Sequence, residues 1–135
     1  MQKQVNNTVD YNEEDHARSV FESLTRSVNR RRVMPPDEEV RCIKAIRDGG
    51  ELSEDARAHL CVTQMREVIA IINQYTYDIN ELWDLLNVGN RAVEKAIDTF
   101  DTDGDISFTH YAEKLIHHAV QEYQDNINAD DSSTD

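Results

Sequence analysis

Residues 83–120 read WDLLNVGNRAVEKAIDTFDTDGDISFTHYAEKLIHHAV, and their pattern predicts two amphipathic helices joined by a polar loop. From Leu82 onward, apolar residues recur at helical spacing and form one stripe, made of Leu82, Leu85, Leu86, Val93, Ala96, Ile97 and Phe100. The opposite side of the same predicted helix is polar and carries Asp84, Asn87, Asn90, Arg91, Glu94 and Lys95. The pattern therefore predicts an amphipathic helix with one buried side and one exposed side.

The second half of the stretch predicts a turn and then another helix. Residues 101–105 read Asp-Thr-Asp-Gly-Asp. Such residues favour turns, because short polar side chains compete for backbone hydrogen bonds and glycine permits a positive φ. The next helix is expected to begin near Ser107 or Thr109 and to bury Tyr111, Leu115, Ala119 or their neighbours.

A short amphipathic helix is predicted near the N-terminus. Its apolar positions are Val20, Phe21, Leu24 and Val28, and it ends in Arg30-Arg31-Arg32, the basic cluster of the sequence. Three arginines at a helix end are typical of a solvated terminus that the helix dipole favours. A contact with phosphate or with an acidic partner is the alternative.

Two more helices are predicted between this one and the quoted stretch. Pro36 fits the first turn of the earlier helix, and Gly49-Gly50 ends it. The later helix runs from Glu54 to about Tyr75, with Ser53 as its predicted cap. Asn80 is expected to cap the helix that follows.

Composition and periodicity together predict an all-α protein. We expect a compact bundle of about five helices over residues 16–123, preceded by a disordered arm at 1–15 and followed by an acidic disordered tail at 124–135. The formal net charge is −13, and acidic side chains outnumber basic ones within the helical part itself. Such a charge repels phosphate unless basic residues gather on one face, although in a chain adapted to high salt it says little about partners.

No motif predicts an enzyme, a metal site or a cofactor. With Gly104 at the sixth position of a calcium-binding loop, the first position falls on Thr99 and the twelfth on His110, so a plain turn is preferred. His110 and His117 share a helical face with Glu113, and His118 is adjacent, but the zinc-binding HExxH spacing is absent. Solvated or partly buried histidines are therefore preferred.

The remaining features favour a cytoplasmic protein that has no membrane contact. Cys42 and Cys61 match no metal spacing and lie among apolar neighbours, which predicts buried thiols in a reducing compartment. The N-terminus does not read as a signal peptide, and no apolar run approaches membrane-spanning length.

The quoted stretch resembles region 2 of the sigma-70 family, the promoter-specificity subunits of bacterial RNA polymerase. Residues 84–90, DLLNVGN, align without a gap with the family pattern DLIQEGN. Residues 96–101, AIDTFD, match AVxKFD, and residues 108–112, FTHYA, match FSTYA. Upstream, residues 38–60 resemble region 1.2, and residues 65–75 resemble region 2.1. The resemblance covers regions 1.2 to 2.4 and about two thirds of the chain.

The resemblance implies a surface for core RNA polymerase. In sigma factors, the helix carrying DLIQEGN docks on the clamp helices of the largest polymerase subunit. By position, the docking residues here are Asp84, Asn87, Asn90, Arg91 and Glu94, while Val88 replaces the acidic residue of the family pattern. An ordinary solvated helix face is the alternative.

The resemblance also implies a surface for the −10 promoter element. By position, its DNA-binding residues are Tyr111, Lys114 and His118, and Tyr111 matches the tyrosine on which the family stacks a base. Lys114 and Leu115 replace the tandem tryptophans of the family. Because stacking on an aromatic side chain contributes about 1–3 kcal/mol per base, we expect only weak promoter binding by the chain alone. A core aromatic is the alternative role for Tyr111.

Two functions follow from the resemblance as expectations. The first is a truncated sigma-like transcription factor that binds core polymerase and takes part in initiation as half of a split sigma factor, with a second sigma-like protein supplying the missing −35 reader. The second is a protein-only sigma mimic, which binds polymerase or an anti-sigma factor without contacting DNA. The acidity and the absent tryptophans favour the second, and the intact DLLNVGN and FTHYA motifs favour the first.

Overall fold

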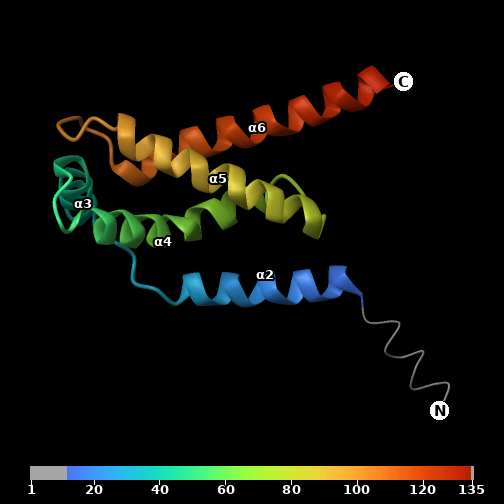
Figure 1. Cartoon of the computed structure of the whole chain (residues 1–135), viewed down its shortest axis with the longest axis horizontal. Coiled ribbons are helices and arrows are strands. Elements are labelled where there is room, and N and C mark those ends of the chain that lie inside the picture. The colour runs from blue at the N-terminus through green and yellow to red at the C-terminus, as the bar shows by residue number, and fades with distance from the viewer. Residues whose placement is uncertain (1–11, 135) are drawn as a thin grey trace, which may run out of the picture.

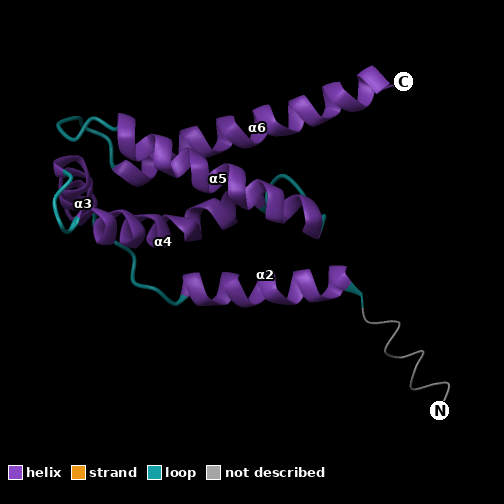
Figure 2. Cartoon of the chain, in the orientation of Figure 1, coloured by secondary structure: helices purple, strands orange, loops and turns teal. Residues whose placement is uncertain are grey.

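The computed structural model describes the backbone of residues 12–134 and the side chains of residues 12–129. Within this range the chain forms five helices and no strand (Figure 2). They are α2 (Glu13–Asn29), α3 (Pro36–Asp48), α4 (Ser53–Ile72), α5 (Ile79–Thr99) and α6 (Phe108–Thr134). The predicted all-α bundle of about five helices is therefore confirmed.

An antiparallel pair, α5 and α6, makes the most extensive helix contact in the bundle (Figure 1). α4 packs against both members of the pair, and α2 packs across α4 and α5. The short helix α3 contacts α4 and α6, at the same end of the bundle as the loop that joins α5 to α6 (Figure 1). The last turns of α6 extend beyond the first turn of α5 in this view.

The core follows the predicted apolar stripe of α5, all of whose seven residues are buried. The stripe is wider than predicted, because Val88, Gly89 and Ala92 are buried as well. On α6, the fully buried residues recur every four positions and are Phe108, Ala112, Ile116 and Val120. The expected Tyr111, Leu115 and Ala119 flank this stripe and are half-buried. The buried residues are therefore the immediate neighbours of the three named ones, as the prediction allowed.

Trp83 attaches α2 to the rest of the bundle. Its indole N–H donates a hydrogen bond to the carbonyl oxygen of Ala17, at 3.2 Å. Its ring meets Phe21 edge to face, with ring centroids 5.3 Å apart. Arg18 adds a hydrogen bond to the carbonyl oxygen of Tyr77, at 3.2 Å. These contacts join α2 to the start of α5 and to the loop before it.

Two helix starts differ from the predicted caps. The N-cap of α4 is Leu52, which makes no side-chain cap, and Ser53 is the first residue of the helix. The N-cap of α5 is Asp78 in place of Asn80, and Asp78 Oδ1 accepts from the backbone N–H groups of Asn80 and Glu81, at 2.9 and 3.4 Å. The helix starts earlier than expected because Ile79, its first residue, is buried and begins the apolar stripe. α4 also ends earlier, at Ile72 and not near Tyr75.

The outer helix ends also differ from the expected boundaries. α2 begins at Glu13, inside the expected disordered arm, because Asn12 accepts a capping hydrogen bond from the Asp15 N–H at 2.7 Å. Residues 1–11 of that arm lie outside the described residues. α6 continues through Thr134, beyond the expected end at Tyr123. A tertiary contact supports this extension, since Gln124 Nε2 donates to Glu81 Oε2 at 3.0 Å.

Candidate functional site

The five residues expected to bind polymerase lie on one side of α5. Asp84, Asn87, Arg91 and Glu94 follow a spacing of three, four and three residues, and all four are exposed. Asn90 lies beside them and is half-buried. The opposite side of α5 is held in the core, so the backbone beneath this polar face is supported along its length. The structure thus brings all five predicted residues together.

Arg57 of α4 lies along one edge of this polar face. Its guanidinium pairs with Glu94 at 3.1 Å and with Asp98 at 3.7 Å. Glu94 and Asp98 are exposed and Arg57 is partly exposed, so each pair contributes at most about 0.2–1 kcal/mol to stability. Asn87 and Asn90, by contrast, make no side-chain hydrogen bond within the described chain, so both amides are available to a partner.

The three residues expected to bind DNA lie on one side of α6. Tyr111, Lys114 and His118 are spaced three and four residues apart, and the last two are exposed. Tyr111 is half-buried, and its hydroxyl lies 2.7 Å from Thr99 Oγ1. Its ring packs against Phe100 with centroids 5.4 Å apart. Part of the Tyr111 ring is therefore used to hold α6 against the end of α5.

A groove between α5 and α6 joins the two predicted surfaces. Its volume is about 330 Å³, and it includes Arg91 from the polymerase set and His118 from the DNA set. Its lining is apolar in part, and its charged residues are the cations Arg91 and Lys95 and the carboxylate of Glu122. The lining residues are Val88, Arg91, Ala92, Lys95, Leu115, His118, Ala119, Glu122, Tyr123 and Asn126. The groove therefore carries two cations against one carboxylate, in contrast to the acidic chain as a whole.

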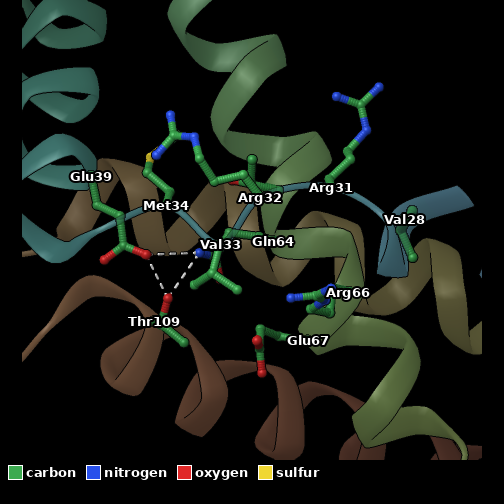
Figure 3. A pocket seen from close by; sticks show the side chains of 11 residues that line it. Val28, Arg31, Arg32, Val33, Met34, Glu39, Gln64, Arg66, Glu67 and Thr109 are labelled. Atoms are coloured by element: carbon green, nitrogen blue, oxygen red, sulfur yellow. Dashed lines mark hydrogen bonds between the residues drawn. The ribbon is translucent and has the colours of Figure 1, made fainter.

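A buried polar junction between α3, α4 and α6 was missed from the sequence (Figure 3). Glu39 Oε2 accepts from Thr109 Oγ1 at 2.6 Å and from Gln64 Nε2 at 3.2 Å. Glu39 and Gln64 are each only 2% exposed. The sequence could have indicated this burial, because both polar residues lie at helical spacing from apolar ones. Glu39 precedes the buried Ile43 by one helical turn, and Gln64 lies one turn from both Leu60 and Val68.

Burial raises the pKa of the Glu39 carboxyl above its ordinary value. The hydrogen bonds from Thr109 and Gln64 act in the opposite direction, and the nearby charge of Glu67 raises the pKa further. Burial and the charge of Glu113 likewise raise the pKa of Glu67. This end of the bundle therefore holds carboxyl groups that retain their protons more strongly than exposed ones do.

The arginine cluster borders the same junction. Arg31 and Arg32 line a small cavity beside Glu39 and Gln64, together with Arg66 of α4. Arg32 pairs with Glu38, both of whose carboxylate oxygens lie 3.1 Å from the guanidinium. Arg66 donates to the carbonyl oxygen of Asn29, and Arg31 extends away from the junction (Figure 3). Of the cluster, Arg32 thus forms an ion pair within the fold, while Arg31 faces outward.

Other predicted features have structural roles. His117 Nδ1 lies 2.7 Å from the Tyr75 hydroxyl, which joins α6 to the loop that follows α4. Residues 101–105 form the predicted turn, in which Asp101 Oδ1 accepts from the Asp103 N–H at 3.0 Å. Cys42 and Cys61 are half-buried free thiols, and burial raises the pKa of both. Across residues 12–134, none of the helices combines the length and apolarity needed to cross a bilayer.

Part of the chain is similar in sequence to a bacterial sigma factor. Over 84 residues, or 62% of this chain, it is 34% identical to the RNA polymerase sigma factor SigA of Lactococcus lactis subsp. cremoris, and the match covers 23% of that protein. The match to SigA of Lactococcus lactis subsp. lactis (strain IL1403) has the same identity and covers 22% of its length. No protein-family model matches the chain. The chain is thus a partial homologue of SigA, and the match spans less than a quarter of each relative.

Proposed function

We propose that this chain is a truncated sigma-like transcription factor that binds core RNA polymerase through the polar face of α5. In this proposal the face, made of Asp84, Asn87, Asn90, Arg91 and Glu94, docks on the clamp helices of the largest subunit, and the chain takes part in transcription initiation. The observation that carries the proposal is the gathering of these five residues on one supported side of α5. The partial homology to SigA supplies the class of partner.

The polar face suits a docking role for two physical reasons. The buried stripe of α5 holds its backbone in place, so little order has to be gained on binding. The free amides of Asn87 and Asn90 offer both donors and acceptors, while Glu94 is already paired with Arg57. The two asparagines are therefore the side chains whose hydrogen bonds a partner would newly complete.

In the leading version, the chain is half of a split sigma factor. Tyr111, Lys114 and His118 then contact the −10 element, and a second sigma-like protein supplies the rest of promoter recognition. The groove between α5 and α6 supports this version, because its two cations offset part of the repulsion that a net charge of −13 exerts on DNA.

The alternative is a protein-only sigma mimic, which binds polymerase or an anti-sigma factor without contacting DNA. One observation favours it. The hydroxyl and ring of Tyr111 contact Thr99 and Phe100 within the fold, so less of this aromatic is available to stack on a base. Both versions use the polar face of α5, so binding to core polymerase tests what they share, and a DNA-binding measurement is needed to separate them.

The first experiment measures binding to purified bacterial core RNA polymerase. Two lost hydrogen bonds at about 0.5–1.5 kcal/mol each predict a complex that is weaker by about 5- to 150-fold for Asn87→Ala combined with Asn90→Ala. The matched control is Ser23→Ala combined with Ser27→Ala, two exposed polar residues on α2, and it is expected to bind like the original protein. Equal weakening in both variants, or no binding of the original protein, would contradict docking through α5.

A second measurement separates the two versions. A promoter fork carrying the −10 element is added to the complex of this chain with core polymerase. A gain in fork binding over core alone, reduced by Lys114→Ala, supports the split sigma factor. Complex formation without such a gain supports the mimic.

A further inference from the structure

The junction of α3, α4 and α6 leaves two buried oxygen atoms without a donor from the described chain. Glu39 Oε2 accepts from Thr109 and Gln64, but neither Glu39 Oε1 nor Gln64 Oε1 has a hydrogen-bond partner in the protein (Figure 3). Both are acceptors when Glu39 is ionised, so two buried acceptors are unmatched. An unmatched buried acceptor is costly, which means that the ionised form suits this site poorly.

The surrounding charges do not compensate an ionised Glu39. On the loop before α3, Arg32 is already paired with Glu38, and Arg31 extends away. On α4, Arg66 is bound to the carbonyl oxygen of Asn29, and Glu67 opposes a second negative charge. On α6, Glu113 adds to the negative field that acts on Glu67. No described side chain forms an ion pair with Glu39, although charged groups approach from α3, α4, α6 and the loop.

We propose that Glu39 is protonated in the closed junction, and that the hydrogen-bonded triangle of Glu39, Gln64 and Thr109 positions the first turn of α6. Gln64 Nε2 donates to Glu39 Oε2 and to Thr109 Oγ1, at 3.2 and 3.0 Å, and Thr109 Oγ1 donates to Glu39 Oε2 at 2.6 Å. Because Oε2 accepts both bonds in either protonation state, the proton lies on Glu39 Oε1, where it removes a buried charge that no cation compensates.

The position of Thr109 gives this proton an effect beyond stability. Thr109 is the second residue of α6, and Tyr111, Lys114 and His118 follow on the same helix. When Glu39 ionises, the buried charge favours opening of the junction, so the hold on the first turn of α6 weakens. Glu39 is thus a positioning residue for that helix. The inference concerns the fold and stands whether or not the chain binds polymerase.

The first test is a pair of pH profiles. A carboxyl whose pKa is raised by folding contributes stability that is present at low pH and is lost as pH rises through the folded pKa. The original protein is therefore expected to lose this contribution as pH rises above 4.5, the ordinary pKa of a glutamate, and through the raised pKa of Glu39. Glu39→Gln keeps an oxygen that can accept from Thr109 and Gln64 and carries no charge at any pH, so the variant should lack this loss and exceed the original protein in stability at neutral pH.

Variants and spectroscopy keep the test specific. Glu67→Gln is the matched control, because Glu67 has a raised pKa but does not bond Thr109, and its profile should retain the Glu39 loss. In carboxyl ¹³C NMR, the Glu39 signal should titrate at higher pH than those of exposed glutamates, and the amide N–H of Thr109 should shift with it. Glu39→Ala is expected to be less stable than Glu39→Gln throughout.

Two outcomes would overturn the proposal. One is a Glu39 carboxyl signal that titrates like an exposed glutamate, with Glu39→Gln less stable than the original protein at neutral pH. This would indicate an ionised carboxylate served by a water molecule, for which the adjoining cavity of about 20 Å³ has room. The other is an unchanged Thr109 signal across the Glu39 titration, which would show that the proton does not act on α6.

Discussion

Gly89 is the point at which α5 comes closest to its neighbours. A Cβ atom placed there would lie 2.5 Å from Val68 Cγ1 of α4 and 3.6 Å from Ile116 Cγ2 of α6. Val68 and Ile116 are fully buried, and a β-branched valine has little rotamer freedom with which to move aside. The glycine of the DLLNVGN motif is therefore required by packing.

Replacing this glycine tests that account. Gly89→Ala is expected to destabilise the protein by about 1–2 kcal/mol, because a contact this close puts the overpacking cost at about 2–3 kcal/mol and alanine recovers about 1 kcal/mol of helix propensity. Urea unfolding followed by circular dichroism measures the change. Gly50→Ala is the control, since a Cβ atom at Gly50 meets nothing within 4 Å. Equal stability of Gly89→Ala and the original protein would show that the three helices can separate at little cost.

Between elements, Arg47 joins the end of α3 to the end of α5. Its guanidinium donates to the carbonyl oxygens of Ile97 and Phe100, at 2.9 and 2.5 Å. Ile97 lies in the last turn of α5 and Phe100 is its C-cap, where acceptors lack helical partners and the helix dipole favours a cation. Arg47 thus closes the C-terminus of α5 just before the turn at residues 101–105.

Removing this cation is expected to loosen the end of α5. Arg47→Met keeps an unbranched apolar side chain and should lower the free energy of unfolding by about 1–2 kcal/mol, the range for hydrogen bonds from a charged donor at a partly exposed site. Lys44→Met, at an exposed position of the same helix, is expected to change it by less than about 0.5 kcal/mol. Urea titration of both variants checks this, and matching losses would rule out a specific cap.

The spacing of apolar residues predicted which side of a helix is buried. Every residue predicted for the apolar stripe of α5 is buried, although the stripe also includes Val88, Gly89 and Ala92. The exposed polar face with Asp84, Asn87 and Arg91 followed from the same spacing. Helix ends were predicted less well. Asp78 replaced Asn80 as a cap, and α6 passed Tyr123, because a helix end depends on local capping and on tertiary contacts such as that of Gln124.

Long-range polar contacts could not be predicted from one sequence. The Glu39–Thr109 hydrogen bond joins residues 70 positions apart, and the Glu39–Gln64 bond joins residues 25 apart. The internal use of the Tyr111 hydroxyl depends on how closely the ends of α5 and α6 approach. Periodicity places each residue on a face of its own helix, but the partner of that face is set by packing.

The net charge of −13 dominates the electrostatics of the whole molecule. Like charges repel within the compact state, and added salt screens them as the Debye length falls from about 30 Å at 0.01 M to about 10 Å at 0.1 M. Thermal unfolding at increasing NaCl is therefore expected to show a Tm that rises by several degrees and then levels off. A Tm that stays flat or falls would contradict net repulsion.

The shape of that salt curve also bears on the origin of the acidity. Screening alone saturates once the Debye length is shorter than the spacing of surface charges. A Tm that continues to rise at molar NaCl would indicate a chain adapted to high salt. Asp103→Asn combined with Asp105→Asn removes two exposed charges from the turn before α6 and should reduce the initial rise.

The single tryptophan of the chain gives α2 an optical signal of its own. Trp83 projects from α5 onto Phe21 and the backbone of Ala17, so α2 shields its indole from water. Release of α2 would hydrate the indole and shift its fluorescence to the red while α4, α5 and α6 stayed packed. The intrinsic emission therefore reports the docking of one helix, and time-resolved quenching can follow that motion without any attached dye.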